Sequence, residues 1–413
     1  MAIQTVALSP PSTPHFAALP PLALYVHIPW CIRKCPYCDF NSHEQRGTLP
    51  ETQYVDALIA DLELALPSIW GRRVVSVFFG GGTPSLFAAA AIDRMLAAIR
   101  ARVPLSPDAE VTLEANPGTF ERLKFAGFKA AGVNRLSLGV QSFNPRHLAA
   151  LGRVHDEREA RTAAAAALEI FDNVNLDLMY ALPGQTQGDA RADAAAALEL
   201  SPPHLSFYHL TIEPNTLFHR HPPPLPDDDT SAAIEDELED ALAKAGYRHY
   251  ETSAFARTGR ECRHNLNYWQ FGDYLGIGAG AHSKLSFPQR IVRQIRPKQP
   301  QQYLEAIARG VPLAEEREIP RGDVGFEFML NTLRLTDGFP IAQFAERTGF
   351  TLAIVQRDID EAERRGLLVR DHQRVRPTPL GRRFLNDLQA LFLPPASPSD
   401  TAAVSRTLAR ATR

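Results

Sequence analysis

Residues 25–40 read Tyr-Val-His-Ile-Pro-Trp-Cys-Ile-Arg-Lys-Cys-Pro-Tyr-Cys-Asp-Phe, and this stretch decides how the rest of the chain is interpreted. It places Cys31, Cys35 and Cys38 within eight positions, although the whole chain of 413 residues has 4 cysteines. An apolar run typical of a strand, Leu22–Ile28, leads directly into them. Three thiols on one short loop after a strand indicate a ligand site for a metal centre.

The spacing of these cysteines, C-x-x-x-C-x-x-C, favours an iron–sulfur cluster over zinc. Structural zinc sites have four protein ligands, usually from two C-x-x-C pairs, and the sequence has no second pair. A four-iron cluster on three thiolates keeps one iron open for another ligand. The spacing resembles that of the radical S-adenosylmethionine (SAM) proteins, in which SAM occupies that iron. We therefore expect a [4Fe-4S] cluster on Cys31, Cys35 and Cys38, with zinc and inert core cysteines as the alternatives.

The length and charge of the chain exclude several classes of protein. A chain of 413 residues can bury one large domain and a smaller one. Its 44 basic and 47 acidic residues nearly balance, so no nucleic-acid partner is expected. No apolar run is long enough to span a bilayer, and residues 1–20 lack the features of a secretory signal. The cysteines are clustered and do not form the paired set expected of a disulfide-bonded protein. This is typical of a reducing compartment, so we expect a cytoplasmic protein.

From Leu22 onward, short apolar runs alternate with longer helical stretches rich in Ala and Leu. This alternation predicts a parallel sheet, because a parallel strand is reached through a long crossover. Loops with functional residue types follow the strands, which favours an incomplete barrel over an open doubly wound sheet. The expected strands are Leu22–Ile28, Val74–Phe79, Val111–Ala115, Arg135–Val140, Val174–Met179 and Leu205–Leu210, and the expected helices are Thr52–Leu66, Ala90–Arg100, Thr119–Ala131, Glu157–Phe171 and Asp189–Leu200.

The chain is expected to divide into five parts. Residues 1–20 form a flexible extension, 21–225 the strand–helix unit and 226–320 a segment that completes this unit after a Pro/Asp-rich break. Residues 321–393 form a small accessory domain and 394–413 a mobile tail. The accessory domain is mainly helical and resembles a winged helix, with a strand pair at 367–370 and 374–376 before a helix at 380–391. Its mixed charge forms no basic face, so we expect it to cap or position the barrel.

Functional residue types follow successive strands at the edge where ligands of such folds gather. Gly80–Thr83 can present backbone groups to a ligand but lacks the Lys and the spacing of a P-loop. Glu114 and Asp177 can accept hydrogen bonds from a ribose or an ammonium group, and Gln141 can do so with its amide. Arg153 can pair with a carboxylate through its fork of N–H groups. Together these groups suit an amino-acid nucleoside, although each alone is more typical of an ordinary loop residue.

A second cluster of functional residue types, Cys262–Trp269, reads Cys-Arg-His-Asn-Leu-Asn-Tyr-Trp. It joins an imidazole and a thiol to two aromatic side chains, and glycine-rich residues follow. Haem needs an axial donor such as His and a large apolar surface. His264 is therefore a candidate haem ligand, with ordinary packing and a flexible lid over the barrel as the alternatives.

Together these motifs resemble the oxygen-independent coproporphyrinogen III oxidase superfamily, specifically its HemW-type haem chaperones. The resemblance runs from about Tyr25 to Leu391 and includes Gly-Gly-Gly-Thr-Pro, Glu-Ala-Asn-Pro, Gly-Val-Gln-Ser-Phe and His-Asn-Leu-Asn-Tyr-Trp. It implies an α/β fold, a radical SAM partial (β/α)6 barrel with a C-terminal accessory domain, and a [4Fe-4S] cluster, SAM and haem as cofactors. The residues that it implies are Tyr25, Tyr37, Gly81, Gly82, Thr83, Glu114, Gln141, Arg153 and Asp177 for SAM, and His264 for haem.

The resemblance implies two functions of different class. The oxidases have one further cysteine where this chain has Phe40, and they carry a longer N-terminal extension. Both differences favour a haem chaperone over a radical SAM oxidase that decarboxylates coproporphyrinogen III to protoporphyrinogen IX. The implied partners are haem and an acceptor haemoprotein such as a respiratory enzyme, with transient membrane association and no nucleic acid. No catalytic residue is predicted, and the resemblance leaves open whether the chain is an enzyme.

Overall fold

The computed structural model describes residues 13–118 and 121–394 and divides the chain into two compact units. The larger unit consists of Pro20–Phe287 and Ile291–Glu318. The smaller unit consists of Pro288–Arg290 and the described parts of Met1–Leu19 and Ile319–Arg413. Residues 1–12 of the predicted extension and 395–413 of the predicted tail lie outside the described residues.

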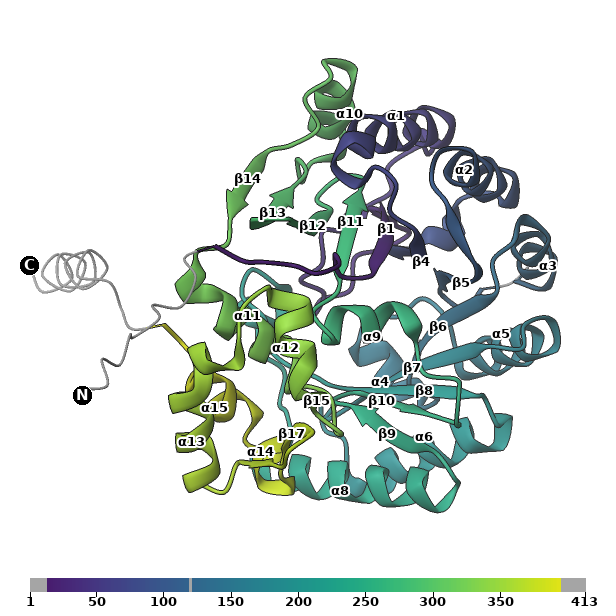
Figure 1. The fold of residues 1–413 in the computed structure, drawn as a ribbon. Helices are drawn as coiled ribbons and strands as arrows, with labels where there is room; N and C mark the ends of the chain where they lie inside the picture. Colours follow the sequence, from purple (N-terminus) through teal and green to yellow (C-terminus); the bar gives the residue numbers. More distant parts are fainter. Residues whose placement is uncertain (1–12, 119–120, 395–413) are drawn as a thin grey trace, which may run out of the picture. The chain divides into compact units, whose positions relative to one another are not determined.

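The larger unit is built on a twelve-stranded sheet with the order β14-β13-β12-β11-β1-β4-β5-β6-β7-β8-β10-β9 (Figure 1). The stretch from β11 to β8 is parallel, and antiparallel strands extend it at both sides. The parallel strands are β1 (Leu22–Ile28), β4 (Val74–Gly81), β5 (Leu105–Ala115), β6 (Arg135–Gln141), β7 (Val174–Tyr180), β8 (His204–His209) and β11 (Asp273–Ile277). The outer strands are β9 (Arg248–Glu251), β10 (Ala254–Ala256), β12 (His282–Phe287), β13 (Arg290–Ile295) and β14 (Glu315–Glu318).

The six strands expected from the sequence are confirmed, and a further parallel strand was not expected. β11 pairs with β1 on the side opposite β4, from Leu22 beside Asp273 to Val26 beside Ile277. It is five residues long and lies in a glycine-rich, aromatic stretch, so its sequence lacks the pattern of a strand. A segment about 250 residues further along the chain therefore extends the sheet beyond its first strand.

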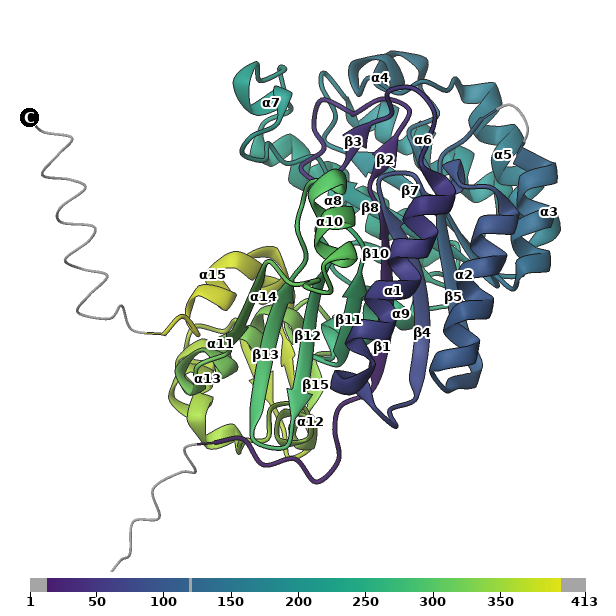
Figure 2. The ribbon, with the colours of Figure 1, turned by 90° about the horizontal axis from the view of Figure 1, so that it is seen from above.

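Helices cover the outer, convex face of the curved sheet (Figure 1). They are α1 (Glu51–Ile69), α2 (Ala89–Arg102), α3 (Glu121–Ala131), α5 (Glu157–Ile170), α6 (Gln187–Leu200) and α8 (Asp228–Lys244). The five expected helices are confirmed, and no described end differs from its expected position by more than three residues. Residues 119 and 120 of the expected third helix lie outside the described residues. Capping boxes start α5 at Asp156 and α6 at Thr186, because each side chain accepts the backbone N–H three residues on. Figure 2 shows the same layers from above.

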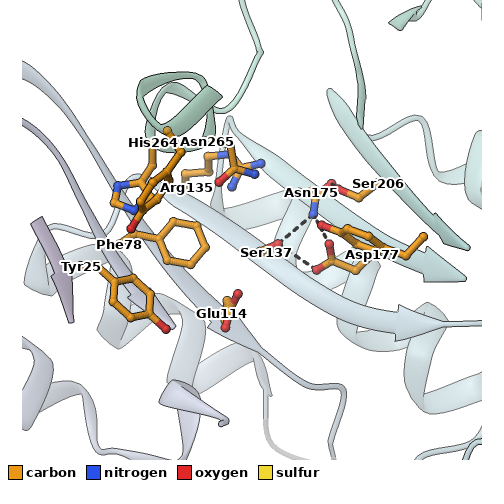
Figure 3. A pocket seen from close by; sticks show the side chains of 12 residues that line it. Tyr25, Phe78, Glu114, Arg135, Ser137, Asn175, Asp177, Ser206, His264 and Asn265 are labelled. Carbon is orange, nitrogen blue, oxygen red and sulfur yellow. Dashed lines mark hydrogen bonds between the residues drawn. The ribbon is translucent and has the colours of Figure 1, made fainter. Parts of the chain in front are cut away.

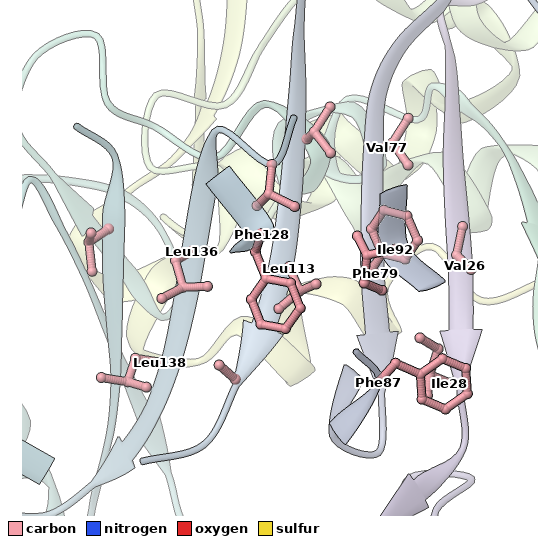
Figure 4. Close-up of a cluster of buried hydrophobic side chains, with 14 of the residues drawn as sticks. Val26, Ile28, Val77, Phe79, Phe87, Ile92, Leu113, Phe128, Leu136 and Leu138 are labelled. Atoms are coloured by element: carbon pink, nitrogen blue, oxygen red, sulfur yellow. The ribbon is translucent and has the colours of Figure 1, made fainter. Parts of the chain in front are cut away.

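Apolar side chains fill the space between the sheet and the outer helices (Figure 4). Alternate strand residues such as Val26, Phe79 and Leu113 point into this core, where they meet Ile92 and Phe128 from the helices. Successive side chains of a strand point to opposite faces of a sheet. The intervening residues of the same strands therefore line the inner, concave face.

A helix from the end of the larger unit packs on that inner face. α9 (Arg263–Trp269) contacts β1, β4 and β11 and appears inside the curve of the sheet in Figure 1. Shorter elements of this unit are β2 (Trp30–Cys31), β3 (His43–Glu44), α4 (Pro145–Ala150), α7 (Leu217–Arg220) and α10 (Pro300–Ala308). Among the described residues of both units, none of the helices has the length and apolar character needed to span a bilayer.

The smaller unit combines helices with a three-stranded sheet. It has α11 (Arg321–Thr332), α12 (Ile341–Thr348), α13 (Gln356–Arg364), α14 (Pro379–Arg383) and α15 (Leu385–Ala390), and its sheet order is β15 (Phe339–Pro340), β17 (Arg374–Pro377), β16 (Leu368–Arg370). The expected strand pair is confirmed as β16 and β17, and β15 adds a strand that was not expected. The single helix expected at 380–391 was wrong: non-helical backbone at Phe384, with φ −110° and ψ 47°, separates α14 from α15.

Candidate cluster site and inner cavity

Two cavities lie on the inner face of the parallel strands. The cluster cavity, of about 450 Å³, is lined by Cys31, Cys35 and Cys38. The inner cavity, of about 220 Å³, is lined by Arg135 and His264. Four residues line both cavities, so the two adjoin; these are Glu114, Ser137, Asp177 and Tyr208.

Nearly all residues that the resemblance implied for SAM meet at the cluster cavity. It is lined by the predicted set Tyr37, Gly81, Gly82, Thr83, Glu114, Gln141, Arg153 and Asp177. Tyr25 is the exception, because its side chain lines the inner cavity, where its hydroxyl forms a hydrogen bond of 3.0 Å with His27 Nδ1. Gly81, Glu114 and Gln141 lie at the carboxyl ends of β4, β5 and β6, which meet at one edge of the sheet. Asp177 lies in the middle of β7, and Tyr37 and Arg153 lie in loops that reach the same cavity.

Local hydrogen bonds shape the loop that carries the three cysteines. The amide of Cys38 donates to the carbonyl of Cys35 over 3.2 Å, and β2, which ends at Cys31, pairs with β3. Lys34 Nζ donates to the carbonyls of Phe40 at 3.2 Å and Ser42 at 3.1 Å, which holds the two ends of the loop together. The loop thus presents three thiols to one cavity.

The donor set at this cavity fits a [4Fe-4S] cluster better than a single zinc ion. Burial raises the pKa of the thiols of Cys31 and Cys38, and a bound metal centre would favour their thiolate form. Within the described ranges, no three His, Cys, Asp or Glu side chains converge closely enough for one ion. The thiolates of a cluster bind different irons, so they need not converge on a single point. When bound, such a cluster supplies one-electron chemistry to its open ligand.

Two glycines beside the cysteine loop leave room for close approach. Gly81 has a left-handed φ of +116°, and a Cβ there would lie 2.5 Å from the ring of His27. A Cβ on Gly82 would lie 2.5 Å from the carbonyl oxygen of Trp30. The backbone of β4 can therefore lie directly against the cysteine loop because these positions carry no side chain.

Arg153 connects the cysteine loop to the ends of β5 and β6. Its Nη1 lies 3.6 Å from Cys35 Sγ, and its Nη2 donates to Asn116 Oδ1 at 2.5 Å and to the carbonyl of Gly139 at 2.7 Å. Asn116 in turn donates to Thr83 Oγ1 over 2.8 Å. Asn116 was not among the predicted site residues, although it stands in the Glu-Ala-Asn-Pro motif, which was the available signal.

Two carboxyl groups lie where the two cavities adjoin. Burial, followed by the nearby charge of Asp177, raises the pKa of Glu114 to about 8, although the amide of Gly81 donates to Glu114 Oε2 over 3.2 Å. Burial also raises the pKa of Asp177, against the hydrogen bonds from Ser137 Oγ at 2.9 Å and Asn175 Nδ2 at 2.8 Å. Glu114 is therefore largely protonated near neutral pH and can donate as well as accept.

His264, the predicted haem ligand, is buried on the inner face of the curved sheet (Figure 3). It is 1% exposed, its Nδ1 forms a 3.0 Å hydrogen bond with Ser76 Oγ, and its ring stacks on Phe78 at 4.8 Å between centroids. Burial, followed by the charge of Arg135, lowers the pKa of His264 to about 3. Its Nε2 has no hydrogen-bond partner within the described part of the chain.

The inner cavity is too small for the macrocycle of haem in this conformation. Pockets for drug-sized ligands have volumes of about 300–1,000 Å³, and the cavity beside His264 measures about 220 Å³. Ligation of haem iron by His264 therefore stays a prediction, and it requires α9 to move.

Glu110 anchors α9 and was not foreseen from the sequence. Its Oε1 accepts from the amide of His264 at 3.1 Å and from Cys262 Sγ at 3.5 Å, and its Oε2 accepts from the amide of Arg263 at 3.1 Å. Glu110 lies in β5, more than 150 residues before α9, so no local pattern could have linked them.

Family models match both units of the chain. The radical SAM superfamily model matches residues 25–197, and the HemN C-terminal domain model matches residues 319–384. The first match contains the cysteine loop and every residue predicted for SAM.

The chain is similar along most of its length to curated relatives. It is 47% identical to the haem chaperone HemW of Escherichia coli over 91% of this chain and 99% of that protein. It is 48% identical to the haem chaperone HemW of Haemophilus influenzae over 91% of this chain and 98% of that protein. A solved structure of coproporphyrinogen III oxidase (HemN) from Escherichia coli, a radical SAM enzyme, matches with a TM-score of 0.77 and 25% identity over 91% of this chain and 90% of that chain. These similarities agree with the cysteine loop and the curved α/β sheet described above. The chain belongs to the HemW haem chaperone family of the radical SAM superfamily.

Proposed function

We propose that this protein is a haem chaperone, which binds haem and passes it to an acceptor haemoprotein. The observation that carries the proposal is the identity of 47–48% to relatives named haem chaperones, over 98–99% of their length. In this proposal Cys31, Cys35 and Cys38 hold a [4Fe-4S] cluster, and the predicted SAM residues around the cluster cavity bind SAM.

The residue at position 40 argues against the alternative function, a radical SAM oxidase of coproporphyrinogen III. The predicted fourth cysteine of the oxidases is replaced by Phe40, whose side chain is 63% exposed beside the cluster cavity. An exposed phenyl ring can contact an apolar ligand but cannot act as a thiol. The lower identity to the oxidase, 25%, agrees with this choice.

The finer parts of the proposal concern the domains, the acceptor and the place in the cell. Residues 226–320 complete the strand–helix unit, and 321–393 form the accessory domain. The acceptor is a haemoprotein such as a respiratory enzyme, which would bring the chaperone transiently to a membrane. A cytoplasmic location suits three cluster thiols, because they need a reducing compartment.

Haem titration of the anaerobically reconstituted protein tests the proposal. We expect stoichiometric binding with a Soret band, and we expect His264→Ala to lose or shift this band. His372→Ala is the matched control, because His372 is exposed in the smaller unit. The proposal is wrong if haem binds neither tightly nor stoichiometrically while the protein converts coproporphyrinogen III with SAM.

A further inference from the structure

Arg135 is a buried cation on the wall of the inner cavity. It is the first residue of β6, it lies on the inner face of the sheet, and it is 2% exposed (Figure 3). Its Nε has no hydrogen-bond partner, and no ion pair reaches its guanidinium within the described residues. A buried charge without a partner is strongly unfavourable, so a ligand that satisfies this guanidinium would stabilise the site.

The two carboxylates whose charges act on Arg135 accept hydrogen bonds from other donors. Glu110 accepts from Cys262 Sγ and from the first two amides of α9, as described above. Asp177 accepts from Ser137 and Asn175. Burial lowers the pKa of Arg135, but the acidic groups around it, Glu110 and Asp177 among them, raise it above its ordinary value overall, so Arg135 is a cation. The N–H groups of the guanidinium stay free for a group inside the cavity.

A second unsatisfied group lines the same cavity. His264 Nε2 is buried without a partner in the described part of the chain, and its Nδ1 is bound to Ser76. When the Ser76 hydroxyl donates to Nδ1, the proton of the neutral imidazole lies on Nε2 and can be donated into the cavity. Asn265 and Tyr268 add an amide and a hydroxyl to the lining.

We propose that the inner cavity is a carboxylate site, in which the Arg135 guanidinium pairs with the two carboxylate oxygens and His264 Nε2–H donates to one of them. Planar bidentate pairing is the geometry in which Arg binds carboxylates. The volume of about 220 Å³ suits a small carboxylate or the carboxylate arm of a larger molecule. The carboxyl of Glu114, which also lines the cavity, is largely protonated near neutral pH and adds little repulsion there.

Haem is the source of the carboxylate that the site fits best, and this identification rests on the proposed function. Haem carries two propionate arms, and each is narrow compared with the macrocycle. The inner cavity adjoins the cluster cavity through four shared lining residues. A propionate can therefore reach Arg135 from that side while the macrocycle stays outside the inner cavity, in a state in which SAM does not occupy the cluster cavity. In this arrangement His264 binds a propionate and does not coordinate the haem iron. A free small carboxylate is the other source of the same chemistry.

The test compares haem with haem dimethyl ester, in which both propionates are esterified, in absorbance titrations of the reconstituted protein. We expect the wild type to bind the ester at least about tenfold more weakly, since a hydrogen bond to a charged group contributes about one power of ten or more. In Arg135→Gln the two ligands should bind alike. The matched control is Arg263→Gln, because Arg263 is a more exposed arginine that pairs with Asp108 at 3.0 Å and does not line the cavity. This control should keep the wild-type preference.

A measurement on the wild type alone keeps the proposal testable if Arg135→Gln does not fold. ¹³C-labelled propionate is titrated into the protein and followed by its NMR shift and linewidth. If propionate binds but haem and its ester bind with equal affinity, the inner cavity binds a free carboxylate. The proposal of a carboxylate site is then supported, and its assignment to haem is wrong. If propionate does not bind and the ester equals haem, the proposal is overturned. If haem itself does not bind, the proposed chaperone function fails, and propionate binding still decides the carboxylate site.

Discussion

Single side chains decide the chemistry of the inner face. Arg153 and Asn116 join the cysteine loop to two neighbouring strands, whereas Glu114 and Asp177 place two carboxyl groups where the cavities adjoin. The two carboxyl groups are only partly exposed and lose much of their hydration in the fold, so their charge states depend on their neighbours more than on the solvent. Stability at this site should therefore depend on pH.

The raised pKa of Glu114 predicts a loss of stability with rising pH. The pKa of this carboxyl is about 8 in the fold, against an ordinary value of 4.5. Between these values the folded protein binds a proton that the unfolded chain has lost, so the free energy of unfolding falls as pH rises. Glu114→Gln removes this proton, and we expect the variant to gain up to a few kcal/mol relative to the wild type between pH 5 and pH 8.

Urea unfolding of both proteins at several pH values, on matched cluster-free samples, measures this difference. The raised pKa of Asp177 lowers stability with rising pH in both proteins, and because its charge interacts with Glu114, the difference between the two pH profiles reports on both carboxyl groups together. Parallel pH profiles for wild type and variant would show that Glu114 is ionised in the fold.

At the scale of elements, α9 has seven residues and depends on an anchor in another strand. A helix this short is marginal by itself, since most helix stability in proteins comes from tertiary contacts. The carboxylate of Glu110 satisfies amides at its first turn, which have no partner inside the helix. The position of His264 therefore depends on β5.

Glu110→Gln should loosen α9 without unfolding the larger unit. Charge-assisted hydrogen bonds contribute about 1.5–3 kcal/mol each, so we expect the α9 amides to exchange about 10 to 100 times faster. Hydrogen exchange with mass spectrometry of the peptide around 263–269 measures this. Asp108→Asn is the control, because it removes the exposed ion pair between Asp108 and Arg263 and leaves the contacts of Glu110 with α9 unchanged. Unchanged exchange in Glu110→Gln would mean that packing alone holds α9.

At the scale of the larger unit, a buried ion pair holds the last part of the sheet to the first helix. Asp61 of α1 pairs with Arg296 over 3.2 Å, and the side chains are 0% and 1% exposed. Asp61 also accepts from the amide of Gly278 at 3.1 Å and from the Tyr303 hydroxyl at 3.0 Å. Gly278 follows β11, Arg296 follows β13, and Tyr303 lies in α10. The carboxylate of Asp61 therefore joins three late segments of the chain to α1.

Asp61→Ala should destabilise the larger unit strongly. Removing one partner of a buried ion pair costs about 3–5 kcal/mol, because the other charge is left uncompensated. The exposed pair of Asp56 and Arg94 provides the control, and Asp56→Ala should cost less than about 1 kcal/mol. Denaturant unfolding followed by tryptophan fluorescence measures both variants. A loss for Asp61→Ala as small as that of the control would contradict this role.

The sequence by itself determined the features that depend on local pattern. Strand and helix positions follow from periods of two and 3.6 residues and from caps such as Asp156 and Thr186. The cysteine spacing indicated the cluster, and successive strand ends indicated the residues that now meet at the cluster cavity. These patterns can be recognised in the sequence alone because their residues lie within a few positions of one another.

Only the tertiary structure decided which distant segments meet. It paired β11 with β1, anchored α9 on Glu110, buried His264 against Ser76, and left Arg135 facing a second cavity. The sequence showed His264 as a candidate ligand, but it could not show how much space surrounds the ring. Burial and cavity volume depend on contacts between residues more than 100 positions apart, and no periodicity or motif in the chain encodes those contacts.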